Sequence, residues 1–259
     1  MLVVEDNETN QQVIIRQLKL LGYRAELAPN GRRALEMWRR NRYSLVLSDL
    51  HMPNMDGFAL VEAIRAEEGA DDRIPFIAFT ANVLPDSRLR GLRVGMDGFL
   101  TKPVQLPKLK AVLDPWITHD RARGQTQTAS GEDWESSGSE PSSFSALPVL
   151  DIDVLRQLVG PDPTVIEELI RDFLVSAQRG VEAVEYGAAS RDLTAVVSAA
   201  HKLKSAARAI GALRLGELSA KLERAGNSDD AASVSALLGD FLRQWEAVRR
   251  EVDRELDAF

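Results

Sequence analysis

The sequence predicts an α/β domain with a doubly wound, five-stranded parallel sheet, followed by an all-α domain built as an antiparallel four-helix bundle. Up to about residue 117, short apolar runs alternate with helical patterns, which is typical of a parallel sheet with helices on both faces. A segment rich in Ser, Gly and acidic residues follows. Beyond residue 150 the pattern is entirely helical.

The first domain, residues 1–117, is expected to contain five strands and five helices. The strands are predicted at the apolar runs 2–4, 24–27, 44–48, 75–79 and 98–101. Helical patterns lie between and after them, including 9–22, 30–40 and 106–116. The run SLVL at 44–47 is mostly apolar with no alternation of polar residues, which suits a strand covered by helices on both faces.

Residues 118–150 are expected to form a flexible linker, because they show almost no apolar periodicity and cannot bury enough apolar area to order themselves. The alternative is a structured loop anchored by Trp134 and Phe144. A Gly/Ser-like coil of about 30 residues has a span of roughly 30 Å, so the two domains can meet.

The second domain, residues 151–259, is expected to consist of helices only. A short leading helix is predicted at 151–158, and four longer ones at 163–188, 192–210, 213–225 and 230–256. Breaks are supplied by Gly160-Pro161, by Gly211 and by the segment 226–228. Amphipathic helices joined by short turns favour an antiparallel bundle.

The composition excludes several classes of protein. The chain has 259 residues, no cysteine and a formal net charge of -7. Without cysteine there is no disulfide framework and no thiolate metal site, so the expected location is the cytoplasm. The apolar runs are too short for a membrane segment, and no signal peptide is expected. No part of the chain carries the cationic excess that nucleic acid binding requires.

Five polar residues follow the predicted strands. Glu5 and Asp6 come after the first strand, Asp49 ends the third, Thr80 ends the fourth and Lys102 ends the fifth. Because ligands bind beyond the carboxyl ends of parallel strands, these side chains are expected to converge. Clustered carboxylates repel one another unless a hard cation lies among them, and oxygen ligands suit Mg²⁺.

A histidine in the second domain is predicted to face outward. On a helical projection of 196–211, His201 lies with Lys204, Ser205 and Arg208, opposite the apolar residues. The two cationic side chains suit an incoming phosphoryl group, and the small Ser205 and Gly211 allow a partner to approach. The alternative is an idle surface histidine.

Residues 1–117 resemble a response-regulator receiver domain, which has a flavodoxin-like fold. The resemblance is carried by VVEDN at 3–7, DLHMPNMDG at 49–57, TAN at 80–82 and TKP at 101–103. It implies that Asp49 is the nucleophile that accepts a phosphoryl group. It also implies that Mg²⁺ is held by the set Glu5, Asp6, Asp49 and the main-chain carbonyl of His51.

The same resemblance implies roles for three further residues. Lys102 would neutralise one phosphoryl oxygen, with a cis peptide bond to Pro103 orienting it. Thr80 would hydrogen-bond another phosphoryl oxygen and take part in switching. Phe99 occupies the position of the aromatic side chain that changes rotamer on activation.

The segment HKLKSAARAIGA at 201–212 resembles the histidine phosphotransfer (Hpt) domain. The match covers one helix closely and the rest of the bundle by pattern. Ser205 stands at a position that often holds Gly. The resemblance implies that His201 is phosphorylated, with Lys204, Ser205, Arg208 and Gly211 in supporting roles.

The two resemblances together predict a two-component phosphorelay module. An upstream histidine kinase domain would phosphorylate Asp49, and His201 would pass the group to or from a separate response regulator receiver. The chain has no nucleotide-binding motif and cannot start the relay from ATP. The domain order resembles the C-terminal part of unorthodox hybrid sensor histidine kinases, which would make the chain a fragment of a longer kinase; transfer within one chain and between chains are both compatible with the sequence.

The sequence leaves two alternative functions open. The chain could be an interaction protein that is switched by phosphorylation without Asp49-to-His201 transfer. It could also be a Mg²⁺-dependent phosphatase with an aspartyl-phosphate intermediate, but the Asp-x-Asp spacing common in such enzymes is absent, since Leu50 and His51 follow Asp49.

Overall fold

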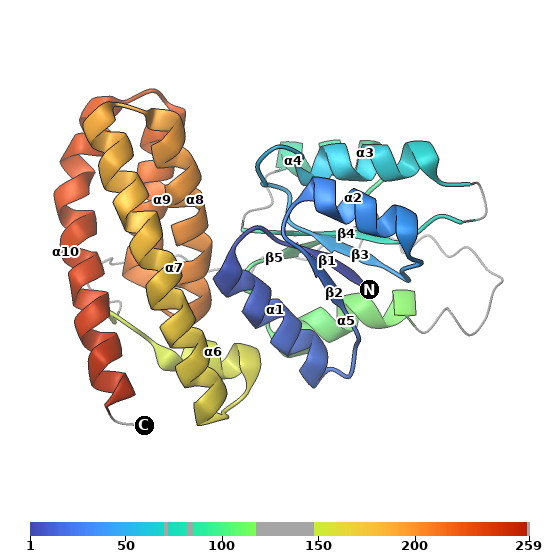
Figure 1. Ribbon diagram of the computed structural model, residues 1–259, viewed down its shortest axis with the longest axis horizontal. Helices are drawn as coiled ribbons and strands as arrows, with labels where there is room; N and C mark the ends of the chain where they lie inside the picture. Colours follow the sequence, from blue (N-terminus) through green and yellow to red (C-terminus); the bar gives the residue numbers. More distant parts are fainter. Residues whose placement is uncertain (70–71, 82–84, 118–147, 258–259) are drawn as a thin grey trace.

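The five predicted strands form one parallel sheet with the order β2-β1-β3-β4-β5 (Figure 1). The structure, a computed structural model, describes residues 1–69, 72–81, 85–117 and 148–257. The strands are β1 (Leu2–Val4), β2 (Glu26–Ala28), β3 (Val46–Ser48), β4 (Phe76–Thr80) and β5 (Gly98–Thr101). The prediction of a doubly wound α/β domain is confirmed.

Helices cover both faces of this sheet. They are α1 (Glu8–Leu20), α2 (Gly31–Arg40), α3 (Gly57–Glu67), α4 (Pro85–Arg93) and α5 (Leu106–Ile117). Figure 1 shows α2, α3 and α4 on one face and α1 with α5 on the other. Successive strand side chains point to opposite faces, so Leu2 and Val4 join one buried cluster and Val3 joins the other. The central strands β1, β3 and β4 are buried on both faces, which is why they are mostly apolar.

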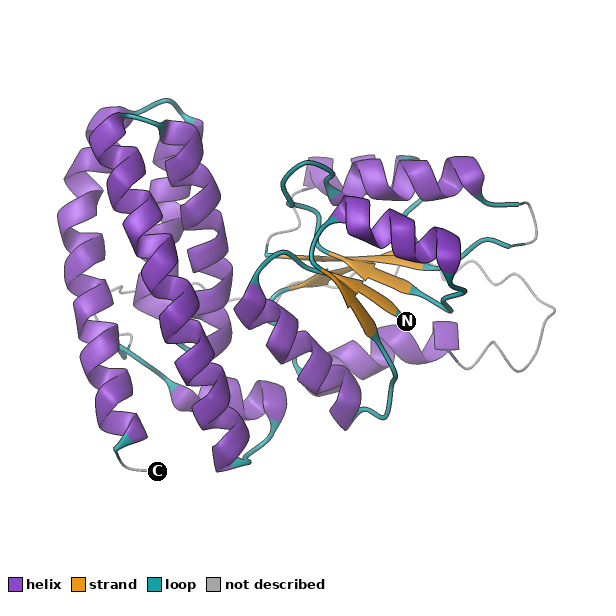
Figure 2. Cartoon of the chain, in the orientation of Figure 1, coloured by secondary structure: helices purple, strands orange, loops and turns teal. Residues whose placement is uncertain are grey.

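The second unit is a bundle of helices (Figure 2). It begins with α6 (Ile152–Val159) and continues with α7 (Pro163–Ser190), α8 (Leu193–Ile210), α9 (Leu213–Asn227) and α10 (Ala231–Leu256). Its centre is filled by one apolar cluster that includes the fully buried rings of Phe173 and Phe241. The predicted bundle with a short leading helix is confirmed, and its helix bounds differ from the predicted ones by at most two residues.

Gly211 ends α8 and has a structural role that the sequence did not reveal. Its φ of +88° is left-handed, and a Cβ atom there would lie 2.0 Å from the carbonyl oxygen of Asp151. The space beside Gly211 is therefore filled by the start of α6. The expectation that Gly211 lets a partner approach is wrong, because this chain occupies that space itself.

The two units are in contact through α1, which packs against α6, α7 and α8. Val13 of α1 belongs to the apolar cluster that fills the bundle. The predicted linker, with Trp134 and Phe144, lies outside the described residues, and the domain limits 1–117 and 151–259 stay predictions. None of the helices in the described ranges combines the length and the hydropathy that a membrane crossing requires.

Candidate functional site

Three carboxylates meet at the carboxyl edge of the sheet. Glu5 and Asp6 follow β1 and Asp49 follows β3, and one oxygen from each lies within 4.8 Å of the others. Glu5 and Asp49 are buried, with 0% and 3% of their surface exposed. The helix α1 starts directly behind them, because the Asn7 side chain caps it by accepting a hydrogen bond from the Asn10 N–H (3.1 Å). The sequence prediction that these acidic residues converge is confirmed.

Lys102 enters this cluster from the end of β5. Its ammonium group donates hydrogen bonds to Glu5 and to Asp49, and its peptide bond to Pro103 is cis, as the resemblance implies. Burial disfavours the charged lysine, but the two carboxylates outweigh it and raise the pKa of Lys102. Burial likewise disfavours the Asp49 carboxylate, yet the charge of Lys102 and a hydrogen bond from the His51 N–H lower its pKa.

Glu5 differs from Asp49, although both contact the same lysine. Burial and the charge of Asp49 raise the pKa of Glu5 to about 7, against the opposing effect of Lys102. One ammonium group therefore does not balance the buried negative charge at this edge. A set of carboxylate oxygens with surplus negative charge fits a hard divalent cation.

The other predicted receiver residues lie around the cluster. Thr80 is fully buried at the end of β4. Phe99 lies on β5 and is partly buried, with the guanidinium carbon of Arg88 5.8 Å from its ring centroid. The His51 N–H donates to Asp49 (3.1 Å), so His51 is placed beside the cluster by its backbone.

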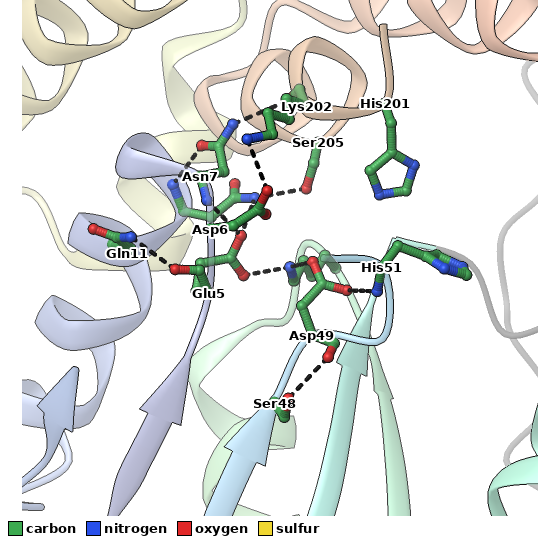
Figure 3. A network of polar contacts seen from close by, with 12 residues as sticks. Glu5, Asp6, Asn7, Gln11, Ser48, Asp49, His51, His201, Lys202 and Ser205 are labelled. Atoms are coloured by element: carbon green, nitrogen blue, oxygen red, sulfur yellow. Dashed lines mark hydrogen bonds and ion pairs between the residues drawn. The ribbon is translucent and has the colours of Figure 1, made fainter. Parts of the chain in front are cut away.

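His201 on α8 faces the receiver. Its ring centroid lies 5.3 Å from that of His51 in an edge-to-face arrangement, and Figure 3 shows it directed toward the loop that carries His51. Burial and the neighbouring charge of His201 lower the pKa of His51. Sequence reasoning assigned the His51 ring no role, and the structure brings it into contact with His201 of the bundle.

His201 is turned away from the core of its own bundle, as predicted, but only 15% of its side chain is accessible. Lys204 and Ser205 are buried as well. The helical projection correctly turned these residues away from the core of their own bundle. It could not reveal that the receiver and α9 cover that face.

Glu223 on α9 is a site residue that sequence reasoning missed. One of its carboxylate oxygens lies 2.7 Å from His201 Nδ1, and the other accepts a hydrogen bond from Lys204 (2.6 Å). Burial opposes the charge of Glu223, but these two hydrogen bonds lower its pKa to about 2. A carboxylate bonded to Nδ1 favours the tautomer with the proton on Nδ1, which leaves the lone pair on Nε2.

A cavity of about 760 Å³ lies where the two domains meet. It is lined by Asp6 and His51 of the receiver and by His201, Lys204 and Arg208 of the bundle, among others. Lys204 is bound to Glu223, and Arg208 forms an ion pair with Glu217. The predicted cationic side chains are therefore beside His201, each held by a carboxylate.

Three polar contacts join the domains beside the acidic cluster (Figure 3). The Asn7 amide donates to the carbonyl of Lys202 (3.2 Å), and Lys202 pairs with Asp6 (2.8 Å). The Asn10 amide donates to Ser205 Oγ (2.8 Å). Asn7 belongs to the VVEDN motif, which pointed to the receiver fold and not to this contact. Asn10 and Lys202 have no sequence signal of their own, because ordinary helix starts and surface faces contain the same residue types.

Two family models match the chain. Residues 1–114 match the response regulator receiver domain, and residues 168–258 match the Hpt domain. Among solved structures, the receiver domain of the sensor histidine kinase PA1611 from Pseudomonas aeruginosa, with a magnesium ion coordinated in its active site cleft, is 41% identical. That alignment has a TM-score of 0.42 and covers 45% of this chain and 95% of that one.

Curated relatives cover both domains. The aerobic respiration control sensor protein ArcB of Escherichia coli is 32% identical over 97% of this chain and 31% of its own length. The sensor protein EvgS of the same organism is 28% identical over all of this chain and 19% of its own length. The hybrid signal transduction protein dokA of Dictyostelium discoideum is 43% identical over 49% of this chain and 7% of its own length. The chain thus spans less than a third of each of these relatives.

Proposed function

Because this chain joins a response regulator receiver domain to an Hpt domain, we propose that it is a two-component phosphorelay module in which Asp49 accepts a phosphoryl group and exchanges it with His201. One observation carries the proposal. The His201 ring lies 5.3 Å from the His51 ring, and the His51 N–H is hydrogen-bonded to Asp49. His51 thus contacts both proposed nucleophiles, Asp49 through its backbone N–H and His201 through its ring.

In the first step, a carboxylate oxygen of Asp49 attacks the phosphorus of a phosphorylated donor, and the donor's bond to phosphorus breaks. Lys102 donates a hydrogen bond to Asp49, so its ammonium group can neutralise the negative charge that develops on the phosphoryl oxygens. Thr80, at the end of the neighbouring strand, is proposed to donate a hydrogen bond to the same group. Glu5, Asp6, Asp49 and the main-chain carbonyl of His51 would hold Mg²⁺, which when bound supplies further positive charge to those oxygens.

In the second step, Nε2 of His201 attacks the phosphorus of the acyl phosphate. The bond between phosphorus and oxygen breaks, and Asp49 leaves as a carboxylate. The imidazole gains positive charge in this step, and Glu223 stabilises it by accepting the Nδ1–H (2.7 Å). Asp49 and Lys102 are buried, which strengthens the charge interactions between them and the transferred group.

The partners follow from this chemistry. An upstream histidine kinase domain would supply the phosphoryl group to Asp49, and a downstream response regulator receiver would take it from His201. The named relatives ArcB and EvgS are sensor proteins and dokA is a hybrid signal transduction protein, so we propose that a longer parent protein of this kind would be a hybrid histidine kinase working in the cytoplasm.

The experiment that tests the proposal follows one labelled phosphoryl group. The chain is incubated with a ³²P-labelled kinase domain and Mg²⁺, stopped at intervals, and treated separately with acid and with base. An acyl phosphate is lost in base, whereas phosphohistidine survives base and is lost in acid. We expect base-labile label first and base-stable label on His201 later; label that stays base-labile throughout would overturn the proposal.

Removal of the divalent cation is expected to slow the labelling of Asp49 by roughly 100-fold, because a bound cation supplies several kcal/mol of charge stabilisation in phosphoryl transfer. Chelation with EDTA and the substitution Asp6→Asn should act in the same direction. The measurement is the initial rate of ³²P incorporation. Asp86→Asn, on the first turn of α4, is the matched control and should label at the unmodified rate; undiminished labelling in EDTA would contradict the metal site.

Glu223→Ala is expected to slow transfer from Asp49 to His201 by roughly 10- to 100-fold, because a hydrogen bond to a charged group is lost. Glu223→Gln should slow it less, since its amide oxygen can still accept the Nδ1–H. Rapid-quench single-turnover rates measure both effects. Labelling of Asp49 should stay unchanged in both variants, and equal transfer rates for all three chains would show that Glu223 does not position His201.

A further inference from the structure

Asn10 on α1 joins the two domains through its side-chain amide. One N–H of the amide donates to Glu5 Oε1 (3.1 Å) and the other to Ser205 Oγ (2.8 Å). Asn10 is 5% exposed and Ser205 is 6% exposed. An amide nitrogen carries two protons, so its donor capacity is fully used by one acceptor from each domain.

The other polar contacts between the domains depend less on which side chains are present. Asn7 donates to the main-chain carbonyl of Lys202, and the lysine of the Lys202–Asp6 ion pair is partly exposed. Val13 buries its apolar side chain in the bundle, and such a contact tolerates small shifts. At the edge, Arg179 lies 3.5 Å from Glu8 and Arg16 lies 3.6 Å from Asp162, with partly or largely exposed side chains. Exposed ion pairs contribute little. Among the polar contacts between the domains in the described residues, the hydrogen bond between Asn10 and Ser205 joins two buried polar side chains, so it depends most on the identity of both residues.

We infer that Asn10 and Ser205 are a selectivity pair that fixes the Hpt helix α8 on the receiver of this chain in the orientation for transfer. The inference rests on the proposed phosphorelay and names two positioning residues for it. Ser205 lies one helical turn beyond His201 on α8, and Asn10 holds Glu5 of the acidic cluster. The pair therefore connects the helix of one phosphorylation site to the metal-binding edge of the other.

The selectivity has a physical cause. A receiver with an apolar side chain at the position of Asn10, or an Hpt helix without a hydroxyl at the position of Ser205, leaves one buried polar group without a partner. Such a mismatch is expected to lower the equilibrium constant for docking of the two domains by roughly 5- to 150-fold. Apolar residues at both positions leave neither side of the pair unsatisfied, and Glu5 keeps its hydrogen bonds from the Asn7 N–H and from Lys102, so the double exchange is expected to recover much of the loss.

The test is a double-mutant cycle on the full chain with Asn10→Leu, Ser205→Ala and both together. Docking is measured without phosphate. The chain has no cysteine, so spin labels can be attached to Glu62→Cys on α3 and Arg250→Cys on α10, both exposed positions. The fraction of molecules in the short, narrow distance population reports the docked state.

We expect each single variant to lower the ratio of docked to undocked chains at least fivefold and the double variant to restore it to within about threefold of the unmodified chain. Thr194→Ala, an exposed substitution on the same helix, is the control and should change nothing. The inference would be overturned if the losses of docking free energy in the two single variants simply added in the double variant. It would also be overturned if the single variants docked like the unmodified chain.

A second measurement separates this inference from the proposed function. Single-turnover transfer from Asp49 to His201 is followed in the same variants and should fall and recover in parallel with docking. If docking shows the coupling while no variant transfers phosphate, the pair stands and the phosphorelay proposal fails. If the unmodified chain transfers phosphate and docking shows no coupling, the phosphorelay stands and the pair fails.

Discussion

Asp49→Asn is expected to abolish the labelling of His201 by a phosphorylated kinase domain, with a rate loss of more than about 10³-fold. A carboxamide is not a nucleophile toward phosphorus, and the loss of a nucleophile is the largest single effect in covalent catalysis. The side chain keeps its shape and can still accept the hydrogen bond from the His51 N–H. The measurement is the time course of base-stable ³²P label on the chain.

Two controls make the Asp49→Asn result specific. The variant must unfold at a temperature close to that of the unmodified chain, since Lys102 keeps Glu5 as a partner after the exchange. A chemically phosphorylated downstream receiver should still label His201 in this variant in the reverse direction. If the kinase domain labels His201 at the unmodified rate, phosphate reaches the histidine without Asp49 and the proposed route is wrong.

His201→Gln is expected to block delivery to a downstream receiver completely, while Asp49 is labelled at the normal rate. Glutamine can still donate a hydrogen bond toward Glu223 but has no nitrogen lone pair that attacks phosphorus. The measurement is label on an added receiver after a single round of Asp49 phosphorylation. Delivery that continues at the normal rate in this variant would remove His201 from the relay.

Mixing the Asp49→Asn and His201→Gln chains distinguishes transfer within one chain from transfer between chains. The docked arrangement of α1 on α6, α7 and α8 predicts transfer within the chain. A docked or tethered domain has an effective concentration on the order of mM, which micromolar mixtures do not reach. The mixture is therefore expected to label His201 far more slowly than the unmodified chain, with a rate that rises with protein concentration.

Much of the receiver site could be predicted because topology places it. Glu5, Asp49 and Lys102 are far apart in the sequence, yet each follows a strand of one parallel sheet. The carboxyl ends of such strands share an edge, so the strand pattern alone brings these side chains together. His201 could be found in the same way, since the helical period turns it away from the apolar core of its bundle.

The sequence by itself determined the two folds, the acidic edge of the sheet and the helix face that carries His201, because each depends on local periodicity and on a general rule of chain topology. The tertiary structure alone decided that Glu223 holds His201, that Gly211 makes room for Asp151, and that Asn10 meets Ser205. These contacts depend on how helices are aligned along one another and how the domains dock. Periodicity identifies the buried face of a helix but not the residue that lies opposite it, so side chains of ordinary type acquired their roles only in the folded chain.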